Sequence, residues 1–422
     1  MIPAPAAAAR NTRSVAADRR CKDKIMKEHA MAVPGFLASG VSAGIKETGA
    51  KDLSLIYSET PARAAGVFTT NAFPAAPVVL SRQRIRCGYA QAILTNSGNA
   101  NAATGEDGYR DALAMGGALA RRLKIDKDFV LVSSTGVIGH RLPLDEIRKG
   151  IPKLVAGLHP EGIKNAEEAI MTTDRFPKLS FRKRMIGGRE ISVCGMAKGA
   201  GMIQPHMATM LAYVMTDADI DAKALDRAFR YGVERSFNAI SVDGCMSTND
   251  TALVLANGVA GNRRIEERGR GFIAFRTMLA EVMTELARDM VRDGEGATKL
   301  LEITVEGART AGEARKMAYA IANSNLVKTA FYGGDPNWGR IIAAAGAMGV
   351  PLPLERVELL FDGVSLFSRG LKTAGNEELL KEVMSRAEIK VIFRAGMGNK
   401  SFRVFASDLG FEYIKINAHY HT

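Results

Sequence analysis

Residues 197–217 contain a hydroxyl group that could act as a nucleophile. The glycine-rich start at 198–201 leads through a proline-containing loop to Ala208 and Thr209, and the apolar run 210–215 comes next. That run is typical of a buried strand, so Thr209 stands at the mouth of a strand, directly after an irregular loop. A threonine hydroxyl needs a base within hydrogen-bond reach. An N-terminal threonine brings its own base, the α-amine, whose ordinary pKa is about 7.7–8.0.

Thr209 becomes N-terminal only if the chain is cut before it. Its hydroxyl would attack the carbonyl carbon of Ala208, an N-to-O acyl shift would give an ester, and water would release the two ends. A small residue before the threonine and a strained loop would favour that attack. The alternative is that Thr209 is an ordinary β-branched strand residue, and the local sequence alone leaves both interpretations open.

A second group of residues could stabilise the negative charge that such a reaction creates. The strand-like run 129–132 leads into 133–139, where Thr135 and Gly136 are neighbours. The Thr135 hydroxyl and the backbone N–H beside it are two donors for the oxyanion of a tetrahedral intermediate. The competing interpretation is a plain turn that ends a strand.

Two polar loops with glycines are candidate binding loops. Residues 96–105 could hold a phosphate or carboxylate on backbone N–H groups, but they match neither common nucleotide-binding glycine pattern, and a structural loop is the alternative. Residues 293–299 would let the Glu295 carboxylate approach a ligand or the Thr209 amine, unless they are only a helix cap with exposed charges. Residues 335–340, with the only tryptophan, are interpreted as a structural or subunit-facing turn.

Short alternating runs and helical stretches must position these groups. Strands are predicted at 53–58, 92–95, 129–133, 182–186, 189–194, 251–256, 357–361, 364–367 and 390–393. Helices are predicted at 109–123, 165–171, 221–236, 272–292, 341–347 and 377–386. The dipeptides Gly187–Gly188 and Asp362–Gly363 predict tight hairpins. The mixture lacks a regular strand–helix–strand rhythm and favours an α+β protein with layered sheets between helices.

Composition limits the class of protein. The 422 residues are 47% hydrophobic and 24% charged, which fits two domains or one large layered body. The net charge of +12 is dispersed, so neither a nucleic-acid nor a membrane partner is predicted, although it would attract anionic substrates. No run approaches the roughly 20 apolar residues of a membrane-spanning helix. Four scattered cysteines fit a reducing cytoplasm. Residues 1–30 predict a disordered leader, with Met26 or Met31 as alternative starts.

Nine separated motifs resemble the glutamate/ornithine N-acetyltransferase family of arginine biosynthesis. They begin near Met31 and run to the end of the chain: VPGF at 33–36, TNSGNANAATG at 95–105, STGVIG at 134–139, MTTD at 171–174, AKGAGMIQPHMATML at 197–211, STNDT at 247–251, GEGATK at 294–299, DPNWGR at 335–340 and YIKINAHYHT at 413–422. Their number and order make the resemblance specific, and it favours the chemical interpretation of Thr209.

The resemblance implies a cut between Ala208 and Thr209, which would give an alpha chain over 31–208 and a beta chain over 209–422. It also implies an oxyanion hole at Thr135 and Gly136. The substrate-binding positions that it implies are Thr172, Lys198, Thr209, Glu295, Asn417 and Thr422. The fold would resemble self-processing aminopeptidases of the N-terminal-nucleophile type, with intertwined fragments that assemble as two alpha and two beta chains.

The reaction that the resemblance implies is a ping-pong acetyl transfer from N2-acetylornithine to glutamate through acetyl-Thr209. No metal or redox cofactor is expected, and acetyl-CoA would be a co-substrate only in a bifunctional enzyme. A related self-cleaving aminopeptidase or amidase is the alternative, and a non-enzymatic anion-binding module is a third. The sequence departs from the family pattern at His206, where Asn is usual, and at Ala103, where Cys is frequent. His206 is expected to change the rate of cleavage.

The C-terminal segment has the pattern of an ordered element, not of a frayed chain end. Residues 411–416 alternate as FEYIKI, which predicts a strand that ties the terminus into a sheet. Asn417 follows at once and Thr422 ends the chain. By the resemblance both contact substrate, so the segment is expected to fold back over the Thr209 pocket.

Overall fold

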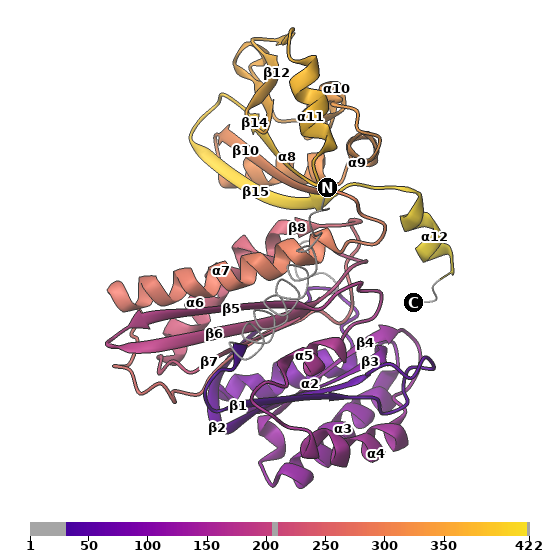
Figure 1. The fold of residues 1–422 in the computed structure, drawn as a ribbon, viewed down its shortest axis with the longest axis vertical. Coiled ribbons are helices and arrows are strands. Elements are labelled where there is room, and N and C mark those ends of the chain that lie inside the picture. Colours follow the sequence, from indigo (N-terminus) through magenta and orange to yellow (C-terminus); the bar gives the residue numbers. More distant parts are fainter. Residues whose placement is uncertain (1–30, 205–209, 420–422) are drawn as a thin grey trace, which may run out of the picture.

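The computed structural model describes residues 31–204 and 210–419, which form two sheet-containing units (Figure 1). The strands are β1 (Phe36–Val41), β2 (Leu53–Phe68), β3 (Tyr89–Asn99), β4 (Val130–Val137), β5 (Lys178–Ile186), β6 (Arg189–Lys198), β7 (Leu211–Thr216), β8 (Ile240–Ser241), β9 (Thr251–Ala256), β10 (Leu300–Ala308), β11 (Glu358–Phe361), β12 (Val364–Ser368), β13 (Leu371–Lys372), β14 (Glu388–Arg394) and β15 (Lys400–Ser407). The helices are α2 (Ala76–Arg84), α3 (Gly105–Leu123), α4 (Leu144–Ala156), α5 (Ile163–Glu168), α6 (Ala222–Arg235), α7 (Arg270–Arg292), α8 (Ala311–Ala322), α9 (Asn325–Tyr332), α10 (Trp338–Gly346), α11 (Glu377–Ser385) and α12 (Phe411–His419).

The first sheet turns a corner at β2. Its order is β4-β3-β2-β9-β7-β6-β5, and β1 pairs with β2 off this path. The first part of β2 pairs with β1 and β3, its last six residues pair with β9, and the register shifts between Tyr57 and Ala62. Pro61 lies in that irregular stretch, where its missing N–H interrupts no ladder hydrogen bond. One long strand therefore joins two halves of the same sheet.

The two halves face each other across a shared core. Alternate residues of β7 show this: Tyr213 packs between the halves, whereas Val214 packs against α6 and α7. In β3, Ile93 likewise packs between the halves, and Leu94 packs toward α3 and α4. The order of layers is thus helices, sheet, sheet, helices (Figure 1). This confirms the predicted α+β class with layered sheets between helices.

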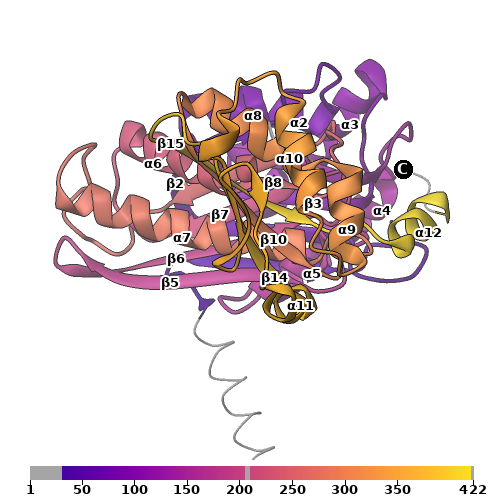
Figure 2. The same ribbon diagram turned by 90° about the horizontal axis from the view of Figure 1, so that it is seen from above.

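The second unit packs against α7. Its sheet has the order β13-β12-β11-β14-β10-β15-β8, and β10 and β15 contact α7. Seen from above, this sheet crosses over the long helix (Figure 2). Trp338 is partly buried and packs against the core of this unit, with its ring stacked on Phe367 at a centroid distance of 5.3 Å. The predicted turn before a helix at 335–340 is confirmed, because α10 begins at Trp338 and the Asn337 side chain accepts from the Arg340 N–H.

Most predicted elements are confirmed. The predicted strand 251–256 coincides with β9, the helix 272–292 with all but two residues of α7, and both glycine hairpins form, as β5–β6 and β11–β12. The helix predicted at 165–171 is shifted, because α5 covers Ile163–Glu168. Of the helices at 31–204 and 210–419, not one has the length and apolar character needed to cross a bilayer.

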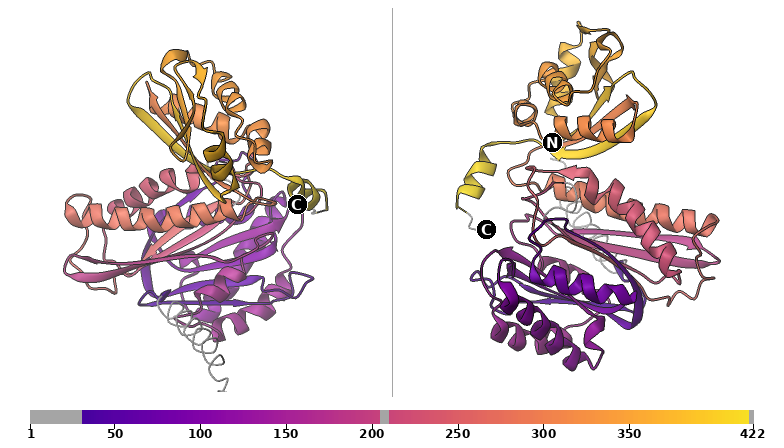
Figure 3. Two further views of the ribbon diagram at one scale, coloured as in Figure 1. Left: turned by 45° about the horizontal axis from the view of Figure 1, so that its top comes forward. Right: turned by 180° about the vertical axis from the view of Figure 1, so that it is seen from behind.

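The predicted strand at 411–416 is wrong. Residues Phe411–His419 form α12, which extends from the second unit toward the level of the first (Figure 3). The FEYIKI alternation does not mark a buried sheet face here, since Phe411 is 77% exposed and Ile414 is 66% exposed. Without a strand edge beside it, the segment satisfies its own backbone in a helix.

Candidate active site

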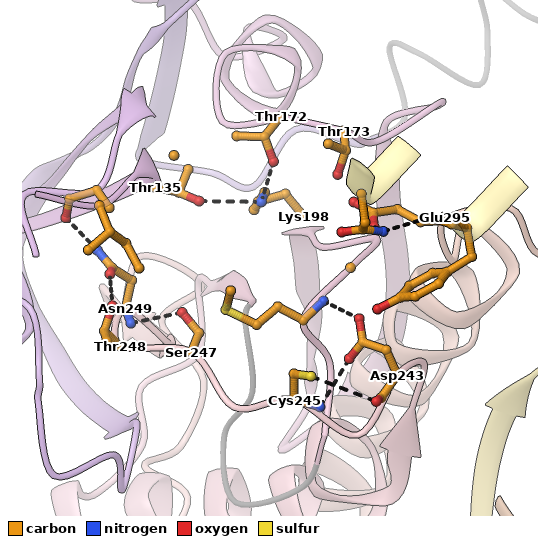
Figure 4. A pocket seen from close by; sticks show the side chains of 17 residues that line it. Thr135, Thr172, Thr173, Lys198, Asp243, Cys245, Ser247, Thr248, Asn249 and Glu295 are labelled. Carbon is orange, nitrogen blue, oxygen red and sulfur yellow. Dashed lines mark hydrogen bonds between the residues drawn. The ribbon is translucent and has the colours of Figure 1, made fainter. Parts of the chain in front are cut away.

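A pocket of about 150 Å³ lies where loops of both units meet the ends of β4 and β6. It is lined by Ala100, Thr135, Gly136, Ile138, Thr172, Thr173, Lys198, Gly201, Met202, Asp243, Cys245, Ser247, Thr248, Asn249, Glu295, Tyr413 and Asn417 (Figure 4). Gly136 and five other residues predicted for substrate binding or the oxyanion hole belong to this set. The five come from separate parts of the chain. The structure therefore brings Thr135, Thr172, Lys198, Glu295 and Asn417 together.

Thr135 and Gly136 lie at the end of β4, where its backbone comes very close to β3. The register pairs Ser97 with Thr135 and Gly98 with Gly136. Gly136 has φ +133°, and a Cβ on it would lie 2.3 Å from the carbonyl carbon of Gly98. Only glycine fits this position. The close approach holds the backbone beside the Thr135 hydroxyl in one conformation.

Residues 96–105, a candidate anion-binding loop in the sequence, form the end of β3, a short connection and the first residue of α3. Their asparagine side chains donate to backbone carbonyls: Asn96 to that of Asn99 at 2.9 Å and Asn101 to that of Gly108 at 2.9 Å. Asn99 also donates to the Arg141 carbonyl at 2.9 Å. These contacts are those of a structural loop.

Lys198 forms one wall of the pocket. It ends β6 and is only 3% exposed. Its Nζ donates to Thr172 Oγ1 at 2.7 Å and to Thr135 Oγ1 at 3.3 Å (Figure 4). Burial lowers the pKa of Lys198, and the nearby Asp174 carboxylate opposes that shift. This wall therefore presents a cation and two hydroxyl groups.

Glu295 and Asn417 also line the pocket. The Glu295 N–H donates to the Ala200 carbonyl at 2.9 Å, which ties the loop after α7 to the loop after β6. The Asn417 side-chain amide donates to Glu295 Oε2 at 2.7 Å. A Cβ on Gly201 would lie 2.4 Å from the Glu295 carboxylate, so glycine lets the carboxylate approach this backbone. The pocket thus contains both a cation and a carboxylate and suits a ligand that carries both signs.

The floor of the pocket leads to the start of β7. Asn249 donates through its side-chain amide to the carbonyls of Ala100 at 2.7 Å and Ser134 at 2.8 Å. The next residue, Asp250, is fully buried and accepts from the Met210 N–H at 2.8 Å. Burial raises the pKa of Asp250 well above its usual value. One short segment therefore anchors both the predicted oxyanion strand and the residue that follows Thr209.

Several lining residues were missed from the sequence. Asp243 accepts from the N–H groups of Met202 at 2.5 Å and Ile203 at 2.9 Å, and so fixes the loop after β6. Cys245 and Tyr413 line the same side, and burial raises the pKa of Tyr413 above its usual range. Asp243 and Cys245 lie outside every motif noted in the sequence, whereas Tyr413 is the first residue of the motif at 413–422.

Some predicted positions lie outside the described residues. Ala208, Thr209 and His206 belong to the segment 205–209, and Thr422 belongs to 420–422. The described neighbours of the first segment are nonetheless close to the site: Leu211 pairs with Lys198 across β7 and β6.

Comparisons with known proteins place the chain in a family. The model of the ArgJ family matches residues 37–422. The arginine biosynthesis bifunctional protein ArgJ of Geobacter sulfurreducens is 49% identical over 393 residues, which cover 93% of this chain and 100% of that protein. The protein of the same name from Syntrophotalea carbinolica is 48% identical over 391 residues, 92% of this chain and 99% of that one. A solved ornithine acetyltransferase from Mycobacterium tuberculosis, complexed with ornithine, is 41% identical, with a TM-score of 0.38, and covers 42% of this chain and 94% of that chain.

Proposed function

The chain belongs to the ArgJ family, and from that premise we propose that it is an acetyltransferase of arginine biosynthesis that moves an acetyl group from N2-acetylornithine to glutamate. One observation carries the proposal: Thr135, Lys198 and Glu295 line a single pocket at the end of the sheet where β7 begins. Both substrates are small amino acids with an α-carboxylate. A pocket lined by a cation and a carboxylate is suited to them.

The first half-reaction that we propose forms an acetyl-enzyme. The α-amine of Thr209 takes the hydroxyl proton while the Oγ attacks the acetyl carbonyl carbon of N2-acetylornithine. The Thr135 hydroxyl and the Gly136 N–H donate to the oxyanion. The C–N bond then breaks, the proton moves to the departing amine, and ornithine leaves with acetyl-Thr209 remaining.

The second half-reaction runs the same steps in reverse with another amine. The α-amine of glutamate attacks the ester carbonyl, loses its proton to the Thr209 amine, and N-acetylglutamate leaves as the threonine hydroxyl is restored. The curated relatives are named bifunctional proteins. In a bifunctional enzyme acetyl-CoA would acetylate glutamate as well, and release of free thiol from acetyl-CoA on addition of glutamate tests that activity.

Maturation is part of the proposal. Thr209 carries a free α-amine only after the bond from Ala208 is cut, so the active form would hold an alpha chain over 31–208 and a beta chain over 209–422. The remaining substrate contacts that we propose are Thr172, Asn417 and Thr422, and the assembly would contain two chains of each kind. Light scattering on the size-exclusion peak measures that assembly.

Product analysis tests the proposed reaction. The purified protein is incubated with N2-acetylornithine, with and without glutamate, and ornithine and N-acetylglutamate are quantified by mass spectrometry. We expect equal amounts of both products, and turnover only when glutamate is present. Release of acetate at a rate that glutamate does not change would instead identify a hydrolase of the aminopeptidase or amidase kind.

A further inference from the structure

The side chain of Asp174 is fully buried beside residues that line the pocket. Its Oδ1 accepts from the Gly199 N–H at 2.7 Å and from Lys178 Nζ at 2.7 Å. Its Oδ2 accepts from the Thr172 N–H at 2.9 Å and lies 3.9 Å from Lys198 Nζ. One side chain therefore holds the backbone of Gly199, the residue after Lys198, and of Thr172, whose hydroxyl accepts from the Lys198 ammonium. The same carboxylate also faces the ammonium itself.

The hydrogen bonds of Lys198 define the direction of the Thr135 hydroxyl. A lysine ammonium has three donors and no acceptor. In its contact with Thr135, Nζ is therefore the donor and Oγ1 is the acceptor. The hydroxyl hydrogen of Thr135 is then left to point elsewhere, and the side chain lines the pocket. A positive charge behind the oxygen also strengthens the hydroxyl as a donor.

We propose that Asp174 is a positioning residue that keeps Lys198 charged, and that charged Lys198 directs the Thr135 hydroxyl toward the oxyanion. The proposal rests on the acetyl transfer proposed above. It gives Lys198 a role in the transition state in addition to any contact with a substrate carboxylate. It also gives a role to the aspartate of the MTTD motif, which the site prediction left unassigned.

The surroundings of Lys198 make its charge depend on Asp174. Burial lowers the pKa of Lys198, Asp174 and the more distant Glu295 and Asp250 raise it, and Lys178 lowers it further. Lys46 adds a second repelling cation nearby. For Asp174 itself, burial raises the pKa, but Lys198 and Lys178 outweigh burial and hold it below its usual range. Asp174 is thus charged at neutral pH and is the strongest partner that opposes loss of the Lys198 proton.

A pH profile separates this role from a merely structural one. The lysine is active when protonated, so kcat should fall as pH rises through its pKa. Asp174→Asn removes the negative charge while keeping the shape, and the alkaline limb of kcat should move to lower pH by one unit or more. Lys198→Arg keeps the charge at every pH, so this variant should lose the alkaline limb while retaining part of the activity.

Asp293→Asn is the matched control. Asp293 is buried and pairs with Lys178 at 2.6 Å and with Arg175 at 2.9 Å, one step further from the pocket. Asp293 contacts the same buried network but not Lys198. The alkaline limb of kcat in Asp293→Asn should therefore stay at the wild-type pH. If Asp174→Asn lowers kcat by the same factor at every pH, without a shift of the alkaline limb, the inference is wrong.

The two proposals fail in distinguishable ways. A wild-type protein without glutamate-dependent transfer would overturn the proposed function before any variant is made. A wild-type protein with that activity, whose alkaline limb persists in Lys198→Arg, would overturn only the role of Lys198. This second variant does not depend on whether Asp174→Asn folds, and circular dichroism of each variant accompanies the kinetics.

Discussion

The side-chain amide of Asn417 donates a hydrogen bond of 2.7 Å to Oε2 of Glu295, and the two residues are 122 positions apart in the chain. Asn417 also donates to the Tyr413 carbonyl at 3.0 Å, one helical turn earlier. The helix α12 therefore delivers both Tyr413 and Asn417 to the pocket. A helical spacing of four residues places them on one face, which the predicted strand would have spread over a much longer distance.

Asn417→Leu should impair acetyl transfer and leave self-cleavage intact. Loss of a hydrogen bond to a charged group costs about 1.5–3 kcal/mol. That corresponds to a roughly 10- to 100-fold fall in kcat/KM, and we expect most of it as a higher KM for both amino acids. Lys415→Ala is the control on the same helix, because Lys415 is 69% exposed in its side chain and pairs only with Glu412 among the described residues. Deletion of 418–422 should have the effect of Asn417→Leu, and unchanged steady-state constants would remove the terminus from the site.

Thr209→Ala should give an uncut and inactive protein. The wild type is expected to run as two fragments on a denaturing gel, because the hydroxyl of Thr209 supplies the attack on the Ala208 carbonyl. N-terminal sequencing of the C-terminal fragment should begin at Thr209. A fragment that begins at any other residue contradicts the proposed nucleophile. His206→Asn, which restores the residue usual in the family, should change the rate of cutting but not its position.

Thr135→Ala should lower kcat by about 10²–10³, the usual cost of removing one oxyanion donor. Thr135→Ser keeps the hydroxyl and should retain most of the activity. With N2-acetylornithine alone, mass spectrometry of the intact beta chain should show one added acetyl group, and peptide mapping should place it on Thr209. An acetyl group on lysine or cysteine, or a loss of only a few-fold in Thr135→Ala, would count against the mechanism.

Glu167→Gln should stabilise the protein at alkaline pH relative to the wild type. Burial raises the pKa of Glu167 to about 9, with a smaller opposing contribution from the Lys178 N–H. The unfolded chain releases this proton near pH 4.3, as an ordinary glutamate does. Between roughly pH 4.3 and 9 the folded state binds the extra proton, so the free energy of unfolding falls as pH rises, by roughly 1 kcal/mol per unit.

Thermal melts at pH 6 and pH 8.5 test this linkage. The difference in Tm between Glu167→Gln and the wild type should grow in favour of the variant at the higher pH. Glu168→Gln is the neighbouring control, because Glu168 is partly exposed and pairs with Lys51 at 2.7 Å. A Tm difference that is the same at both pH values would show that Glu167 does not hold a proton in the folded state.

The sequence predicted the local elements better than their arrangement. The hairpin at Gly187–Gly188 and the strand β9 carry their own signals, namely two glycines that tolerate positive φ and a short apolar run. The corner in β2 has no such local signal. It depends on the pairing of β2 with β3 and with β9 around Pro61, which the sequence of β2 does not encode. For α12 the alternation of apolar and polar residues was misleading, because the segment is mostly exposed and its apolar side chains do not pack into a core.

The candidate site shows the same limit. Local sequence left both a functional and a structural interpretation open for Thr135 and for Glu295. It was the ordered set of motifs that favoured a site. The register between β3 and β4 and the loop contact from Glu295 to Ala200 then bring these residues together. Asp174 was not singled out because nothing in MTTD predicts that its carboxylate reaches Lys198 and Gly199, in and just beyond β6.

The order of strands in the first sheet has a consequence for how the two proposed chains can be made. β7 and β9, from the beta chain, lie between β2 and β6, from the alpha chain. An isolated alpha chain would leave a slot of three inter-strand spacings, roughly 14 Å at about 4.8 Å each. Both sides of the slot would be bare, buried-type strand edges, which invite aggregation. Folding must therefore precede cutting, and mixing two separately produced halves should yield far less enzyme than expressing the single precursor.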